Sequence, residues 1–227
     1  MNNEKILNKA IANSNNVAIS ITSFYNSAVQ FQQLLMFYDC AIKQVSTKLD
    51  ILKSEFTSKN KRNPICSVSN RIKEPISILE KTQRLNINFS IDNIITQIND
   101  IAGIRVICPF IDDVYFINNF INNQEDIDVV ETKDYILNPK KSGYRSLHLI
   151  VKVSVCFSDK IRKIPVEIQI RTIAMDFWAC LEHQIHYKKD FKMPKNIDIE
   201  LKEIAQEIAN TDNRMLKLAK SIINFED

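Results

Sequence analysis

Apolar residues recur at intervals of three and four in two long stretches, one near each end of the chain. The first, from Ser23 to about Phe56, predicts an amphipathic helix with Ser23 as its N-cap. The second, from about Asp198 to Ile223, follows Pro194 and predicts another helix. The first 20 residues are rich in Asn and have only weak helical spacing, which predicts a short or frayed helix.

Between these helices, apolar and polar residues follow the periods of strands and shorter helices. Strands are predicted over 65–72, 101–108, 127–136, 144–155 and 164–170. Helices are predicted over 75–84, 91–98, 114–121 and 172–188, and the first of these starts at Pro75, because a first helical turn accepts proline. This order of elements predicts a mixed α/β (α+β) domain with helical extensions at both termini.

Composition then narrows the class of protein. The 227 residues are 45% apolar and 25% charged, as in soluble globular proteins. A net charge of +3 is small for a protein that coats nucleic acid, so an anionic partner must meet locally clustered cations. The only two glycines, Gly103 and Gly143, lie too far apart for a Walker loop or a GxGxxG fingerprint.

Cysteine spacing and hydropathy indicate the compartment. Five widely separated cysteines fit neither a disulfide framework nor a zinc site, which predicts reduced thiols. No apolar run approaches the roughly 18 to 20 residues that a membrane span needs, and no signal-peptide core precedes the domain. We therefore expect a cytoplasmic protein that does not bind a membrane.

Two groups of residues in the first half of the chain could bind phosphates and a metal ion. Asp100 lies at the mouth of a predicted buried strand and Arg105 lies within it, an arrangement suited to Mg²⁺ beside a guanidinium clamp. A surface turn with a salt-bridged arginine would explain the same pair. The second group comes from a predicted strand and the helix after it, and a solvated basic face is its plain alternative; it consists of Arg71, Lys73, Lys81 and Arg84.

A third group surrounds the polar connector 137–143. Tyr144 follows its Pro/Gly turn, and lysine and arginine beside an aromatic ring suit an anionic ligand that carries a flat base. A basic, solvated hairpin is the alternative. The side chains that can be cationic are Lys133, Lys140, Lys141, Arg145 and His148.

The strand predicted over 164–170 carries the fourth group. Its period of two places Glu167, Gln169 and Arg171 on one face and apolar residues on the other. A carboxylate, an amide and a guanidinium in line can bind a metal, orient a sugar hydroxyl and hold a phosphate, although a half-buried strand without function shows the same pattern.

The helix predicted after this strand supplies aromatic residues and two histidines. Phe177, Trp178 and Leu181 are predicted to be core residues. His183 and His186 stand three residues apart but lack a further ligand, so a shared metal is not favoured. Together the four groups concentrate cations in a nearly neutral chain, as two polyphosphate ligands meeting in one cleft would require.

At these residues the chain resembles the synthetase domain of the RelA/SpoT alarmone synthetases, specifically the small single-domain members, over about residues 40 to 190. Each motif is weak alone, and together they are specific. The matching pieces are Arg71-Ile-Lys73 with Pro75 and Ser77-Ile-Leu-Glu-Lys81, Asp100-Ile-Ala-Gly-Ile-Arg105, Lys133-Asp134-Tyr135, Pro139-Lys140 with Gly143-Tyr144-Arg145-Ser146-Leu147-His148, Glu167-Ile-Gln169-Ile-Arg171-Thr172, and Asp176-Phe-Trp-Ala-Cys-Leu-Glu182-His183.

The resemblance implies a nucleotidyltransferase-like mixed sheet and a Mg²⁺-dependent transfer of the β,γ-diphosphate of ATP to the ribose 3′-hydroxyl of GTP or GDP. It implies that the acidic pair Asp100 and Glu167 is catalytic and serves Mg²⁺ and the attacking hydroxyl, with Glu167 as either the base for the 3′-hydroxyl or a metal ligand. It implies that Arg71 and Arg105 sandwich the adenine of ATP. The ATP phosphates would face Lys73, Lys81 and Arg84, and the guanine nucleotide would be bound by Lys133, Lys140, Tyr144, Arg145, His148, Gln169 and Arg171.

The resemblance also sets expectations for organisation. We expect an Asn-rich segment over 1–22, the synthetase domain over 23–190 and a C-terminal helical extension over 191–227 that serves oligomerisation, since small members are homotetramers built through terminal helices. The length leaves no room for the hydrolase domain of long members, so the chain should make alarmone without degrading it.

Two departures from the family pattern leave alternatives open. Ser142 stands where the family usually has Asn, and the upstream motif is Glu131-Thr-Lys133-Asp134, so the preference between GTP and GDP is undecided. A toxin-type diphosphotransferase acting on adenosine nucleotides or the tRNA 3′ end is one alternative. A catalytically silent nucleotide- or RNA-binding protein is another, and the paired acids argue against it, because binding alone gains nothing from two carboxylates amid phosphates. The net charge leaves regulation by RNA open.

Overall fold

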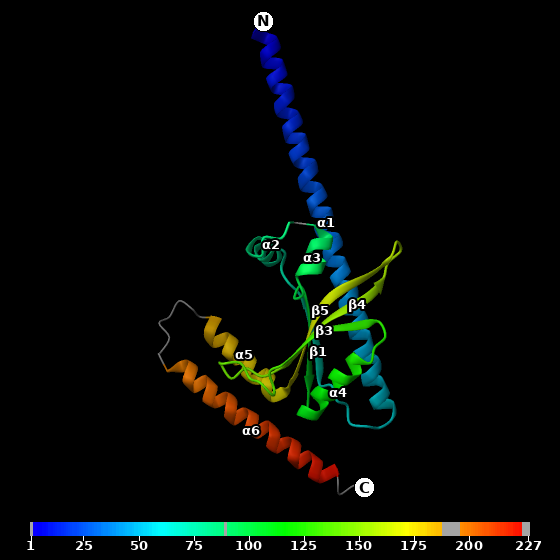
Figure 1. Ribbon diagram of the computed structural model, residues 1–227, viewed down its shortest axis with the longest axis vertical. Coiled ribbons are helices and arrows are strands. Elements are labelled where there is room, and N and C mark those ends of the chain that lie inside the picture. Colours follow the sequence, from blue (N-terminus) through cyan, green and yellow to red (C-terminus); the bar gives the residue numbers. More distant parts are fainter. Residues whose placement is uncertain (1, 89, 188–195, 224–227) are drawn as a thin grey trace.

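A single long helix, α1 (Asn2–Ser58), forms the N-terminal part of the structure (Figure 1). The structure is a computed structural model and describes residues 2–88, 90–187 and 196–223. The prediction of an N-cap at Ser23 is wrong, because Ser23 lies inside α1. The first 58 residues contain neither glycine nor proline, so nothing in their backbone interrupts the helix where its apolar spacing weakens.

Five strands form one mixed sheet in the order β1-β2-β5-β4-β3. Only β2 and β5 are parallel, and the other neighbouring pairs are antiparallel. The mixed sheet confirms the predicted fold class, and the strands lie within a few residues of the predicted ranges. Their bounds are β1 (Ser67–Ile72), β2 (Ala102–Cys108), β3 (Ile127–Asp134), β4 (Leu147–Cys156) and β5 (Ile161–Thr172).

The sheet has one apolar face and one polar face. On β5, Val166, Ile168 and Ile170 are fully buried, whereas Glu167 and Gln169, which alternate with them, are only partly buried. The apolar side packs against α1 and against α4 (Ile111–Asn122), which contribute Leu34, Tyr38, Val114 and Ile117 to one core cluster. The polar face is therefore available for a site.

Two short helices cover the end of the sheet where β1 ends and β2 begins. α2 (Pro75–Arg84) begins at the predicted proline, whose fixed φ suits a first helical turn. α3 (Ile91–Gln97) begins after Ser90, whose side-chain oxygen accepts a hydrogen bond from the backbone N–H of Asn93. These helices position the segment that contains Asp100 and leads into β2.

Two further helices lie on the other side of the sheet from α1 (Figure 1). α5 (Ile173–Tyr187) follows β5 directly, and α6 (Ile197–Ile223) packs along it. The predicted end of α5 at residue 188 and the domain boundary at 190 lie outside the described residues. Among the helices that the structure describes, none combines the length and the apolar character that crossing a bilayer requires.

The prediction that three hydrophobic residues of α5 are core residues is right only for Trp178. Its side chain is buried and its indole N–H donates to the carbonyl of Leu201 on α6 at 3.0 Å. Phe177 and Leu181 are 58% and 47% exposed. The reason is geometric: α5 contacts its neighbours through one stripe, which contains Met175, Trp178 and Ala179, so residues beside that stripe face outward.

Candidate active site

The register of the sheet aligns the predicted site residues in two rows on its polar face. Residues that are paired across neighbouring strands point to the same side. One row runs through Ser69, Arg105, Gln169, His148 and Lys133, and the next runs through Arg71, Gly103, Glu167, Ile150 and Glu131. Residues from all five strands, predicted from separate motifs, therefore share one surface.

Glu167 lies in the middle strand of this surface and both of its carboxylate oxygens accept hydrogen bonds. His148 Nδ1 lies 3.1 Å from Oε1, and Gln169 Nε2 donates to Oε2 at 3.0 Å. The hydrogen bond from His148 lowers the pKa of Glu167 and outweighs the opposing effect of burial. The negative charge of Asp100 acts weakly in the opposite direction on the pKa of Glu167.

A chain of close polar contacts links Arg171 to His148 through Tyr144. The buried guanidinium of Arg171 donates to the hydroxyl oxygen of Tyr144 at 2.6 Å, and that hydroxyl lies 2.8 Å from His148 Nε2. Because the ionised carboxylate of Glu167 can only accept, Nδ1 of His148 is the donor in the contact between these two residues. The geometry therefore orients the imidazole toward the carboxylate.

Aromatic rings and lysines form the side of the surface next to the connector. The ammonium of Lys140 lies 4.7 Å from the ring centre of Tyr135 and 4.6 Å from that of Tyr144. Tyr135 also meets the His148 ring edge-on at 5.2 Å. Lys133 is exposed and forms an ion pair with Glu131 at 3.0 Å. This corner presents flat rings and positive charge together.

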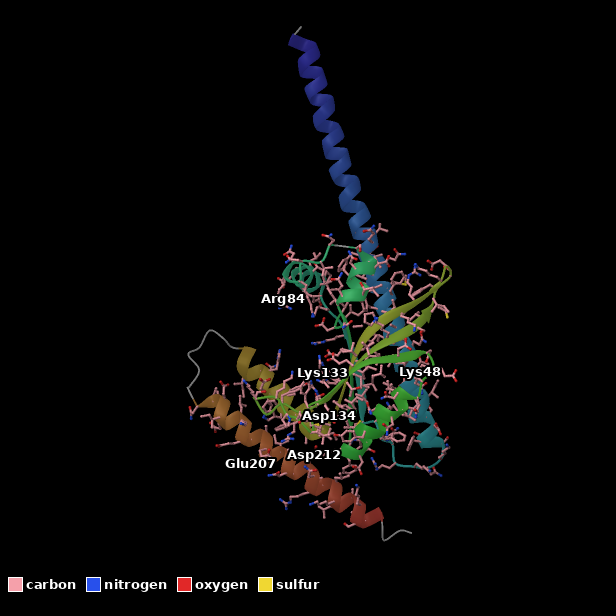
Figure 2. All side chains as sticks on the ribbon, in the orientation of Figure 1. Lys48, Arg84, Lys133, Asp134, Glu207 and Asp212 are labelled. Carbon is pink, nitrogen blue, oxygen red and sulfur yellow. The ribbon has the colours of Figure 1, made fainter. Side chains whose placement is uncertain are left out.

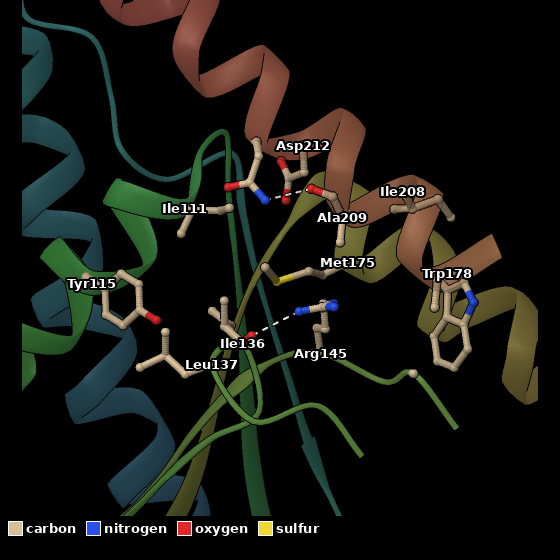
Figure 3. A pocket seen from close by; sticks show the side chains of 13 residues that line it. Ile111, Tyr115, Ile136, Leu137, Arg145, Met175, Trp178, Ile208, Ala209 and Asp212 are labelled. Atoms are coloured by element: carbon tan, nitrogen blue, oxygen red, sulfur yellow. Dashed lines mark hydrogen bonds between the residues drawn. The ribbon is translucent and has the colours of Figure 1, made fainter. Parts of the chain in front are cut away.

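Arg145 does not join the cluster around Glu167. Its guanidinium donates to the carbonyl of Ile136 and to the side chain of Gln206 on α6, each at 3.0 Å. The residue instead lines a largely apolar pocket of about 230 Å³ between α4, α5, α6 and the connector (Figure 3). The same pocket is lined by Asp212, whose pKa is raised by burial despite a hydrogen bond from Thr172 at 2.6 Å.

Asp100 holds two of the predicted lysines. Its Oδ2 accepts from Lys73 at 3.0 Å and its Oδ1 accepts from Lys81 at 2.5 Å. Burial alone would raise the pKa of Asp100, but these two ammonium groups outweigh that effect and lower it. Arg84 comes from the same helix as Lys81 and is exposed at its C-terminal end (Figure 2).

Two neighbouring hollows share Arg71, Arg105 and Gln169 as lining residues. The first, of about 130 Å³, is lined by Arg71, Gly103, Arg105 and Gln169. The second, of about 340 Å³, adds Tyr144 and Arg171 and the side chains of α5 that face them. The side chain of Arg71 lies beside Gly103, since a Cβ at this glycine would be 3.6 Å from Arg71 Cγ and 3.7 Å from Arg71 Nε.

Two residues of this site were not assigned a role from the sequence. The sequence signal for Tyr135 is an aromatic residue two positions after Lys133, close to the connector that leads to Tyr144. Asp176, in the first turn of α5, accepts from Arg171 at 3.1 Å and lies 3.4 Å from a nitrogen of Arg105. No periodicity of the sequence indicates that contact, because it joins a helix to two strands.

The structure limits what metal the site could hold unaided. Within the described ranges, no group of three His, Cys, Asp or Glu side chains is placed to hold a metal ion. The side chain of His186 lies outside the described residues, so the weighing of a His183–His186 pair stays a prediction. Asp100 and Glu167 offer only carboxylate oxygens, which suit Mg²⁺ when substrate phosphates complete its coordination.

Comparison with known proteins gives the same picture. The family model described as "Region found in RelA / SpoT proteins" matches residues 70–192. GTP pyrophosphokinase YwaC of Bacillus subtilis is 41% identical over 83% of this chain and 90% of its own length. The solved structure of small alarmone synthetase 1 of Bacillus subtilis bound to its product pppGpp has a TM-score of 0.77 and 33% identity, over 86% of this chain and 98% of that one.

Small alarmone synthetase 2 of the same organism has a TM-score of 0.76 and 40% identity, over 85% of this chain and 99% of its own. These similarities cover more than four fifths of the chain and do not depend on a single motif. The chain belongs to the RelA/SpoT family, and its neighbours in both sequence and structure are the small alarmone synthetases.

Proposed function

We propose that this protein is a GTP diphosphokinase that transfers the β,γ-diphosphate of ATP to the ribose 3′-hydroxyl of GTP or GDP. The observation that carries the proposal is the position of Glu167. It lies at the centre of a polar sheet face, oriented by His148 and Gln169, with cationic residues on both sides. Membership of the RelA/SpoT family supports the same reaction.

ATP is assigned to the side of the face formed by β1 and β2. The guanidinium groups of Arg71 and Arg105 line the same hollow above Gly103, so a flat adenine can stack between them. Lys73, Lys81 and Arg84 face the phosphates. The two lysines leave Asp100 for the phosphates when ATP binds, because a polyphosphate carries more negative charge than one carboxylate.

The guanine nucleotide is assigned to the side formed by β3, β4 and the connector. Tyr144 and Tyr135 supply ring faces for the base, and Lys133 and Lys140 supply charge for its phosphates. Lys140 now lies over both rings, so stacking of a base requires its ammonium to move aside. Arg171 and Gln169 keep Tyr144 and Glu167 in place beneath the nucleotide.

Mg²⁺ would be held by Asp100 and Glu167 together with the phosphates of ATP. The ion would neutralise charge on the transferred diphosphate. Glu167 orients the 3′-hydroxyl and accepts its proton at a carboxylate oxygen as the oxygen attacks the β-phosphorus and AMP leaves. Because phosphoryl transfer has a loose transition state, a carboxylate of lowered pKa suffices for this task.

The terminal helices suit an assembly of copies in the cytoplasm. Met215, Leu218 and Ile222 on α6 are all more than half exposed and lie beyond the part of the helix that packs on α5. We include a homotetramer joined through α1 and α6 in the proposal, as apolar side chains on a surface helix favour a covering partner.

A product assay tests the proposed function. Purified protein, Mg²⁺ and ATP labelled at the γ-phosphate are incubated with GTP, GDP, ATP or bulk tRNA in separate reactions, and the label and AMP are followed by chromatography. Label on a guanine nucleotide with stoichiometric AMP, lost when EDTA removes Mg²⁺, is the expected result. Label on tRNA or adenosine nucleotides would indicate a toxin, and no transfer would indicate a binding protein.

A further inference from the structure

One carboxylate of α5 joins the two halves of the polar face. Asp176 Oδ1 accepts a hydrogen bond from Arg171 at 3.1 Å, and the same oxygen lies 3.4 Å from Arg105 Nη1. The Asp176 side chain is 25% exposed. It lies in the first turn of α5, beyond the C-terminal ends of the parallel strands β2 and β5.

The two guanidinium groups differ in what they serve. Arg105 lines the hollow assigned to adenine, on the side of Arg71 and Gly103. Arg171 has its other nitrogen on Tyr144 at 2.6 Å and on Gln169 at 2.9 Å, on the side assigned to the guanine nucleotide. A movement of either arginine therefore changes the environment of the carboxylate that holds the other.

The negative charge of Asp176 strengthens the link between Arg105 and Arg171. Two guanidinium groups that share one oxygen atom repel each other when the carboxylate is neutral, and each would turn toward the nearest phosphate instead of keeping its planar contact. Asp176 does not lie among the lysines that face phosphates, so its charge is used to hold arginines and not to bind a metal.

Resting on the proposed function, we propose that Asp176 is a positioning residue that couples the two nucleotide sites, so that one bound nucleotide pre-orders the arginine needed by the other. The coupling is reciprocal by linkage: ATP tightens binding of the guanine nucleotide by the same factor as the reverse. Sharing one carboxylate makes this factor depend on the charge of residue 176.

The test measures this factor directly. The dissociation constant of GTP is measured by calorimetry with and without saturating ATP analogue that has a methylene between its α- and β-phosphates, for wild type, Asp176→Asn and Asp176→Glu. We expect the analogue to tighten GTP binding in wild type by at least about fivefold, at the lower end of common coupling factors. Asp176→Asn should reduce the factor to near one, and Asp176→Glu should restore part of it.

A matched control separates coupling from general damage. Asp159→Asn removes another carboxylate that holds an arginine, Arg162, at the turn between β4 and β5 and remote from the hollows. It should keep the wild-type coupling factor. In steady state, Asp176→Asn should lower kcat/KM for both substrates by about tenfold, the size expected when one charged hydrogen bond is lost.

The outcomes are distinct. A wild-type coupling factor of one, or a factor unchanged by Asp176→Asn, overturns the role of Asp176 even if the enzyme is active. If wild type transfers no diphosphate to a guanine nucleotide, the proposed function fails, whatever the binding experiment shows. If Asp176→Asn does not fold, Asp176→Glu decides. The shared anchor is contradicted if Asp176→Glu keeps the wild-type coupling factor while its two KM values change unequally.

Discussion

Replacing Glu167 by glutamine gives the sharpest test of the site. The change keeps the shape of the side chain and removes its charge. One oxygen remains to accept from either His148 or Gln169, and the new amide group faces a donor on the other side. Because glutamine keeps the volume of the side chain and one accepting oxygen, His148 and Gln169 should stay in place and nucleotide binding should be nearly unchanged.

The expected loss is in turnover. A positioned general base contributes roughly 10²- to 10⁴-fold, so kcat should fall at least about 100-fold, or about 2.7 kcal/mol in the activation free energy. Both KM values should stay within a few-fold of wild type, since the lost interaction acts in the transition state. The assay is AMP release with each substrate varied in turn, and calorimetry with the methylene ATP analogue checks binding.

The control is Asp128→Asn. It neutralises a carboxylate that accepts a hydrogen bond from Lys163 at 2.5 Å and that lies outside the two polar rows. It should keep the wild-type kcat. A Glu167→Gln variant that retains more than a tenth of the wild-type rate, or that raises KM with kcat unchanged, would refute the assignment.

The wild-type rate should fall on acidification only below the usual pKa range of a glutamate, because the His148 hydrogen bond lowers the pKa of Glu167 and keeps it ionised.

Three changes elsewhere test the packing of the fold by thermal unfolding. Asp212→Asn should raise Tm near neutral pH and raise it less below the usual pKa range of an aspartate. The folded pKa of Asp212 is raised, so its stabilising contribution is full at low pH and is lost as pH rises through that pKa; a change in Tm that is the same at both pH values contradicts this. Tyr38→Phe should stabilise by about 1 kcal/mol, since the buried hydroxyl bonds no described residue, and a lower Tm would show that it has a partner. Gly143→Ala should destabilise by about 2 kcal/mol, because φ is +93° and its new Cβ would lie 2.6 Å from that of Ala205; wild-type stability would contradict the close packing.

Local features of the site were predictable because they depend on short-range rules. The period of two in β5 separates Glu167 from its apolar neighbours whatever the rest of the fold does. Pro75 marks the start of α2 for the same kind of reason. The family resemblance supplied which of these polar residues belong to one site, and residue spacing alone did not.

Contacts across the sheet could not be derived from spacing. The parallel pairing of β2 with β5 places Arg105 beside Gln169, although Gln169 lies 64 positions later in the chain and α4, β3 and β4 come between the two strands. Arg145 was assigned to the guanine nucleotide together with its neighbours, but it turns to α6, because the connector packs against that helix at Gly143. The exposure of Phe177 likewise depends on tertiary packing, because α5 contacts its neighbours through one stripe of residues that does not include Phe177.

The arrangement of charges explains how a chain with a net charge of only +3 can offer a site to two polyphosphates. Asp100 holds two lysines, and Asp176 holds one arginine and lies near a second. Each cation is thus oriented before any nucleotide arrives, and each carboxylate lowers the attraction for unrelated polyanions. Under the proposed function the two acids then differ: phosphates displace Asp100 from its lysines and free it for Mg²⁺, whereas Asp176 keeps its arginines, because stacking and ring-holding need their planes fixed. Neutralising Asp100 should therefore abolish turnover, and neutralising Asp176 should weaken communication between the substrates.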